Sequence, residues 1–112
     1  LCGAWRPDVL ALEQNFVGRN VQSAFRLGEV RGVAMLVAAA AGIDVAEYPP
    51  ATVKLAVTGT GRAEKEQVQR AIERELRVGE RMVSDAADAL AIALCHLHSS
   101  RLTSMLAAVR TR

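Results

Sequence analysis

Residues 9–48 contain two short apolar segments separated by one long helical segment, and this order is the strongest constraint on the fold. Residues 9–12 form a continuous apolar run that ends at Glu13, a pattern typical of a buried strand. A long helix is predicted at about residues 21–41, and a second strand at residues 43–48. A strand, a crossover helix and a second strand in this order predict a parallel pair.

Three further helices are predicted after this crossover, at residues 51–57, at residues 63–78 and from Ser84 onward. Residues 58–61, with the sequence TGTG, are a predicted turn; glycine pairs of this kind are only a weak sign of a phosphate site. We therefore expect an α/β fold with packed helices. In the last helix the predicted core-facing stripe is Ala86, Ala89, Leu90, Ala93, Leu94 and Leu97.

Composition limits the classes of protein that fit. The 112 residues suit one domain, and the alanine-rich apolar content of 51% favours packed helices over a β-sandwich. Net charge is −1 over residues 1–48 and +3 over residues 49–112, a mild asymmetry compatible with a polyanionic partner. Two cysteines without metal-site spacing predict a reducing cytoplasm. The longest apolar run has nine residues, so no membrane partner is expected.

Carboxylates at two places are candidate metal ligands. Asp85 and Asp88 lie three positions apart on one predicted helix, so their Cβ atoms are about 5–6 Å apart. A divalent cation would relieve their repulsion and use both as oxygen ligands. The alternative is that both acids only solvate the start of the helix. His96 follows Asp85 by eleven residues, about 16 Å along a helix, and is not expected to share its metal.

Several segments, taken together, resemble the RuvC-type Holliday junction resolvases over residues 5–98. The matching segments are RPDVLALEQ at 6–14 with Phe16 and Asn20, LGEVRGVA at 27–34, VK at 53–54, TGTG at 58–61, KEQV at 65–68 and DAADALAIA at 85–93. Each segment alone is weak, but their order and density make the resemblance specific.

This resemblance implies an RNase H-like fold, a homodimer and a structure-specific endonuclease that nicks four-way DNA junctions in recombination and repair. It implies Mg²⁺ as the cofactor, with Mn²⁺ as a substitute, and a branch-migration helicase complex as a further partner. The expected nuclease domain is residues 1–98, followed by a basic tail at 99–112. The metal-binding catalytic acids would be Glu13, Asp85 and Asp88. The DNA-binding residues would be Phe16, Arg19, Lys54 and Lys65.

One departure from the family pattern leaves alternatives open. The family begins with strands that include a fourth acid, and nothing here matches them; Asp44 follows a helix stop and is not counted as that acid. The chain, which opens on Leu1, therefore resembles the C-terminal two-thirds of a resolvase. The alternatives are a non-catalytic junction-binding relative, another RNase H-like nuclease such as the YqgF-like proteins, and a plain helical dimerisation domain.

Overall fold

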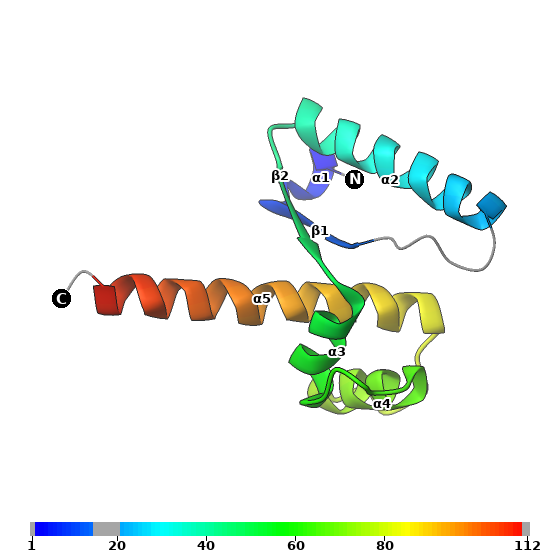
Figure 1. The fold of residues 1–112 in the computed structure, drawn as a ribbon, viewed down its shortest axis with the longest axis vertical. Coiled ribbons are helices and arrows are strands. Elements are labelled where there is room, and N and C mark those ends of the chain that lie inside the picture. Colours follow the sequence, from blue (N-terminus) through cyan, green and yellow to red (C-terminus); the bar gives the residue numbers. More distant parts are fainter. Residues whose placement is uncertain (1, 15–20, 111–112) are drawn as a thin grey trace. The chain divides into compact units, whose positions relative to one another are not determined.

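The computed structural model describes residues 2–14 and 21–110, which are divided between two compact units, Leu1–Glu47 and Tyr48–Arg112. Each unit is described below by itself (Figure 1). None of the helices in the described residues is long and apolar enough to cross a lipid bilayer.

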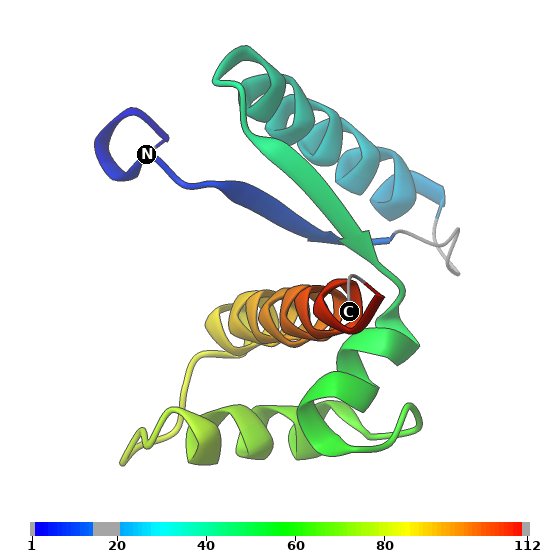
Figure 2. The ribbon, with the colours of Figure 1, turned by 90° about the vertical axis from the view of Figure 1, so that its left-hand side faces the viewer.

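The first unit contains the predicted strand–helix–strand crossover. Its elements are α1 (Cys2–Trp5), β1 (Val9–Glu13), α2 (Val21–Ala40) and β2 (Asp44–Tyr48), whose last residue is the first of the second unit. Strands β1 and β2 are hydrogen-bonded neighbours and run in the same direction, with α2 connecting them (Figure 2). The prediction of a parallel pair is confirmed. The Arg6-Pro7-Asp8 sequence predicts that residues 1–7 are a connector, whereas residues 2–5 form one helical turn.

A glycine ends α2 and directs the chain into β2. Gly42 has a φ of +71°, a left-handed conformation that residues with a Cβ rarely adopt. The N–H of Ile43 donates to the carbonyl of Ala38 at 2.8 Å, which satisfies a carbonyl at the end of the helix. The predicted role of Gly42 as the residue after the helix is confirmed.

Much of the apolar surface of α2 is exposed. Val30, Val33 and Leu36 are 62–70% exposed, and Ala38 alone among the described residues of this helix is buried. Because the second half of this helix is apolar nearly all round, the sequence predicts its burial on more than one side, with a second subunit as a candidate for covering it; within this chain most of that surface is exposed. The β1–β2 pair is too small to cover a 20-residue helix.

The second unit is a cluster of three helices that pack pairwise: α3 (Pro50–Thr58), α4 (Lys65–Glu75) and α5 (Ser84–Arg110). All three helices were predicted, with small differences at their ends. Their shared core consists of Val53, Ala63, Val68, Ile72, Ala91 and Cys95. Alanine and cysteine on α5 are small enough to let α3 and α4 approach closely.

The buried face of α5 matches the predicted face only in part, because Leu90 and Leu94 pack against the core as predicted but the alanines of the stripe do not. Ala87, Ala91 and Cys95 are buried, whereas Ala86, Ala89 and Ala93 are exposed. The core-facing stripe is therefore shifted by about one residue. The prediction failed at the alanines because alanine occupies both faces, so that the period of apolar residues does not identify the side that packs.

Helix α5 continues without a break to Arg110, and its C-terminal part extends past α3 and α4 (Figure 1). Residues 99–112 were expected to be a frayed basic tail, whereas residues 99–110 continue α5 as helix, with residues 101–110 all exposed. The segment carries exposed apolar side chains, including Leu102 and Leu106, at helical spacing.

Candidate active site

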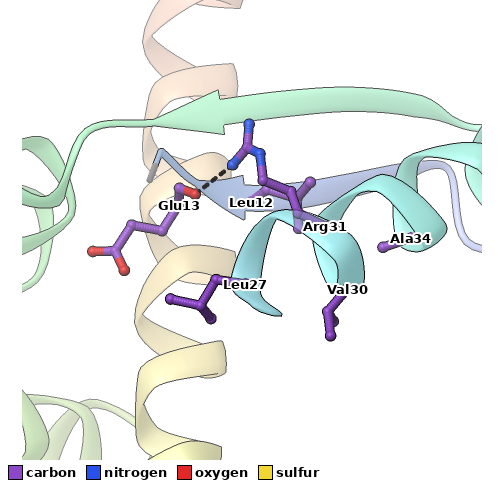
Figure 3. A pocket seen from close by; sticks show the side chains of 6 residues that line it. All are labelled: Leu12, Glu13, Leu27, Val30, Arg31 and Ala34. Atoms are coloured by element: carbon purple, nitrogen blue, oxygen red, sulfur yellow. Dashed lines mark hydrogen bonds between the residues drawn. The ribbon is translucent and has the colours of Figure 1, made fainter. Parts of the chain in front are cut away.

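Glu13 lies at the C-terminal end of β1 and is exposed, while the four preceding strand residues are half-buried. Its backbone carbonyl accepts a hydrogen bond from Nη1 of Arg31 at 2.7 Å. Figure 3 shows the carboxylate extending away from Arg31. The backbone of Glu13 is thus fixed, and its carboxylate is available to a ligand.

Arg31 joins α2 to both strands. Besides its bond to Glu13, its Nη2 pairs with the carboxylate of Glu47 on β2, and the Arg31 side chain is only 19% exposed. Sequence reasoning included Arg31 in a family motif but assigned it no role. The sequence feature that could have identified it is its place: Arg31 immediately precedes a long uncharged part of the predicted helix.

A hollow of about 180 Å³ lies between β1 and α2. It is lined by Leu12, Glu13, Leu27, Val30, Arg31 and Ala34 (Figure 3). Its lining side chains are mostly apolar, so the hollow suits an apolar side chain better than a phosphate group.

Asp85 and Asp88 lie at the start of α5, and both are exposed. Asp85 occupies the first turn, where the helix dipole favours an anion. Asp88 forms an ion pair with Lys65, its Oδ2 being 3.4 Å from Nζ. The structure therefore brings two of the predicted site residues together, one from α4 and one from α5.

Lys65 is the first residue of α4, a position at which the helix dipole disfavours a cation. The helix starts there because Glu64 and Gln67 form a capping box: the Glu64 N–H donates to Oε1 of Gln67 at 2.7 Å, and the Glu64 side chain accepts from the Gln67 backbone. From the sequence, the neighbouring acids Glu64 and Glu66 are sufficient to offset the unfavourable charge of Lys65 at this position. In the structure it is Asp88, on another helix, that pairs with it.

Lys54 lies on α3 and is half-buried. The hydroxyl of Thr58 donates to the Lys54 carbonyl at 2.7 Å. Gly59, with a φ of +87°, caps the helix by donating its N–H to the Leu55 carbonyl. The TGTG segment is therefore explained as the C-terminal cap of α3.

The histidines and the buried cysteine have structural explanations. The Tyr48 hydroxyl and Nδ1 of His96 lie 2.6 Å apart in a hydrogen bond, and His98 is exposed, as predicted for core-edge and surface groups. Burial raises the pKa of the Cys95 thiol, which makes it a poor metal ligand or nucleophile. In the described part of the second unit, no group of three or more His, Cys, Asp or Glu side chains could hold a metal ion.

Comparison with known proteins gives a consistent result. The family model "Crossover junction endodeoxyribonuclease RuvC" matches residues 1–96. The RuvC of Geobacter sp. (strain M21) is 48% identical over 106 residues, which cover 95% of this chain and 65% of the relative. That of Syntrophomonas wolfei is 48% identical over 109 residues, covering 96% and 63%.

The chain belongs to the RuvC family. Its fold also matches the solved structure of Thermus thermophilus RuvC, with 36% identity, a TM-score of 0.82, and coverage of 91% of this chain and 62% of that one. The structure of T. thermophilus RuvC in complex with Holliday junction substrate matches over the same shares with a TM-score of 0.84. These likenesses confirm the predicted RNase H-like α/β fold.

Membership of the RuvC family accounts for all the motifs in which the resemblance was found. The chain spans about 65% of the length of the first relatives that it matches. Of the predicted RuvC-type site residues, Glu13 belongs to the first unit, and Lys54, Lys65, Asp85 and Asp88 belong to the second. Phe16 and Arg19 lie outside the described residues.

Proposed function

We propose that this chain is the larger part of a structure-specific endonuclease that nicks four-way DNA junctions in recombination and repair. The observation that carries the proposal is the exposed Asp85–Asp88 pair at the start of α5, in a chain of the RuvC family. The matched T. thermophilus structure, described as a complex with Holliday junction substrate, supports a junction as the ligand.

Divalent-cation binding by Glu13, Asp85 and Asp88 is the chemical basis of this proposal. All three carboxylates are exposed, and aspartate and glutamate oxygens are the donors that Mg²⁺ and Mn²⁺ prefer. Asp88 already holds the Lys65 ammonium group at 3.4 Å, so this surface attracts a cation. Bound there, the metal would activate water and neutralise the charge that develops on the phosphodiester.

The chain's own residues bind and orient the DNA. Lys65 lies next to Asp88, where its positive charge suits a phosphate close to the metal ligands. Lys54, Phe16 and Arg19 are proposed as further DNA contacts, with Phe16 stacking on an unpaired base. Within the second unit, the 3.4 Å contact between Lys65 on α4 and Asp88 on α5 supports a phosphate contact beside the proposed metal ligands.

A homodimer is proposed as the functional state, in the cytoplasm. Its support is the exposed apolar surface of α2, where Val30, Val33 and Leu36 are 62–70% exposed. A branch-migration helicase complex is proposed as a further partner, and its support is the chain's membership of the RuvC family.

Cleavage of a labelled four-way junction in Mg²⁺ tests the proposed function. The protein tested is this chain extended at its N-terminus by strands that carry the additional family acid. We expect nicking by the unsubstituted protein, and its loss with Asp88→Asn and with Glu13→Gln, which remove charge but preserve shape. Glu80→Gln, at an exposed acid outside the proposed site, is the matched control and should leave cleavage unchanged.

Binding measurements separate the competing functions. All three proposed ligand substitutions, including Asp85→Asn, should preserve or strengthen junction binding, because each removes negative charge that faces phosphates. Binding without cleavage in either Mg²⁺ or Mn²⁺ would favour the non-catalytic junction binder. Intact cleavage in the substituted proteins would reduce Asp85 and Asp88 to solvated acids at a helix start.

A further inference from the structure

Three side chains from the first turns of α4 contact the beginning of α5 or the segment that leads into it. The contacts are Lys65 with Asp88 at 3.4 Å, Glu66 with Arg81 at 3.0 Å, and Gln69 with the Met82 carbonyl at 2.7 Å. The start of α5 is therefore attached to α4 at three residues. Arg81 and Met82 precede the helix, and Asp88 lies within it.

The Gln69 contact differs from the other two in its burial. Gln69 is 7% exposed and is the buried polar residue among those that the structure describes. Its Nε2 donates to the Met82 carbonyl. The Lys65 and Glu66 ion pairs are more than half exposed, where solvent and salt weaken them. Removing the Gln69 donor would leave a carbonyl unsatisfied, so this contact should be the strongest of the three.

The path from Gln69 to the proposed metal ligands is short and runs through the backbone. Met82 lies two residues before Ser84, where α5 begins. The next carbonyl, that of Val83, accepts a hydrogen bond from the Ala87 N–H at 3.0 Å and so closes the first turn. Fixing the Met82 carbonyl therefore fixes the direction in which α5 starts, and with it the turn that carries Asp85.

We propose that Gln69 is a positioning residue: its hydrogen bond to the Met82 carbonyl holds the first turn of α5 in the orientation in which Asp85 and Asp88 bind a divalent cation. This inference rests on the proposed function of those two acids. A ligand set that is held before the metal arrives loses less conformational freedom on binding and binds more tightly.

Gln69→Leu and Gln67→Leu form a matched pair of variants for the test. Each removes the amide of a glutamine on α4 and one hydrogen bond, but the bond of Gln67 goes to its own helix cap at Glu64. Two quantities are measured on the extended protein: hydrogen-exchange protection of the Ala87 and Ile72 amides, and Mn²⁺ affinity by electron paramagnetic resonance.

We expect Gln69→Leu to lower the protection of Ala87 by at least tenfold more than that of the core residue Ile72. Mn²⁺ affinity should fall about tenfold, the scale typical of residues that orient metal ligands. Gln67→Leu should change the Ala87-to-Ile72 ratio and the Mn²⁺ affinity less than twofold. If Gln69→Leu does not fold, Gln69→Asn, whose amide is one methylene too short, should show the same changes on a smaller scale.

Equal loss of protection at Ala87 and Ile72, with unchanged Mn²⁺ affinity, would overturn the inference and leave Gln69 as an ordinary core residue. The proposed function fails by a different result: Mn²⁺ affinity that is unaffected by Asp88→Asn. The exchange measurement needs no metal, so it decides whether Gln69 holds the start of α5 in either case.

Discussion

At the scale of single residues, the second unit places opposite charges close together on exposed surface. Lys65 pairs with Asp88, and Glu66 pairs with both Arg70 and Arg81. These pairs stabilise the fold little, because solvent screens them. Their effect is to determine which charges a ligand meets, and two predictions concern them.

Lys65→Ala should weaken junction binding and make its salt dependence shallower. Each phosphate neutralised contributes about −0.9 to the slope of log affinity against log salt concentration, so the slope should change by about that amount. Fluorescence anisotropy over a salt series measures it. Arg74→Ala, at the other end of α4, is the control and should leave the slope unchanged. An unchanged slope for Lys65→Ala would exclude this residue from the DNA interface.

Glu66 should make a pH-dependent contribution to stability. The hydrogen bond from Arg81 and the charges of Arg81 and Arg70 lower the pKa of Glu66 below its usual value of 4.5. A carboxyl whose pKa is lower in the folded state contributes its stability above the unfolded pKa, and loses it as the pH falls through the folded value.

Glu66→Gln should therefore lower the free energy of unfolding at pH 7 and have a smaller effect below pH about 4. Urea denaturation at both pH values provides the measurement. Glu80→Gln serves as the matched control, because Glu80 is an exposed acid outside this network. The same loss at both pH values would contradict an electrostatic role for Glu66.

At the scale of elements, strands and helices were predictable but several of their contacts were not. The β1–α2–β2 order followed from two apolar runs and a helical period, and Gly42 marked the end of α2. Arg31 and Gln69 were missed because their partners, Glu13 and Met82, lie 18 and 13 positions away in sequence. Such pairs become neighbours only when helices pack, which no local pattern records.

The corrected face of α5 can be tested with two alanines on the same helix. Ala91 is 2% exposed, whereas Ala93 is exposed. Ala91→Leu should destabilise the protein by about 1–3 kcal/mol, because extra methylenes must enter a filled core. Ala93→Leu should change stability by no more than about 0.5 kcal/mol. Denaturant unfolding gives both values, and the reverse order would restore the face predicted from sequence.

At the scale of the whole molecule, family membership and fold could be predicted from the sequence. Whether the proposed metal ligands lie close together could not. Glu13, Asp85 and Asp88 were identified through resemblance to RuvC-type enzymes, and their exposure agrees with ligand binding. Glu13 belongs to one unit of the chain and Asp85 and Asp88 belong to the other, so no local sequence pattern predicts whether they form one site. The roles of Glu13, Lys54, Lys65, Asp85 and Asp88 remain predictions, as do those of Phe16 and Arg19, which lie outside the described residues.

The isolated 112-residue chain should be prone to self-association. The sheet has two strands in the described residues, so its outer edges are unpaired there, and Phe25, Val30 and Leu36 on α2 are 68–70% exposed. We expect binding of the dye ANS and a broad thermal transition, measured by fluorescence and calorimetry. A sharp cooperative transition with no ANS binding would mean that these surfaces are stable without a partner.

The length of α5 determines where a protease would first cut the second unit. Residues 84–95 are supported by α3 and α4, whereas residues 99–110 extend beyond them (Figure 1). A helix segment of about 12 residues without tertiary support is only marginally stable in water, so it opens often. Brief digestion with trypsin should therefore cleave after Arg110 and Arg101 before it cleaves after Arg74, leaving a fragment that ends at Arg101 and keeps the packed core.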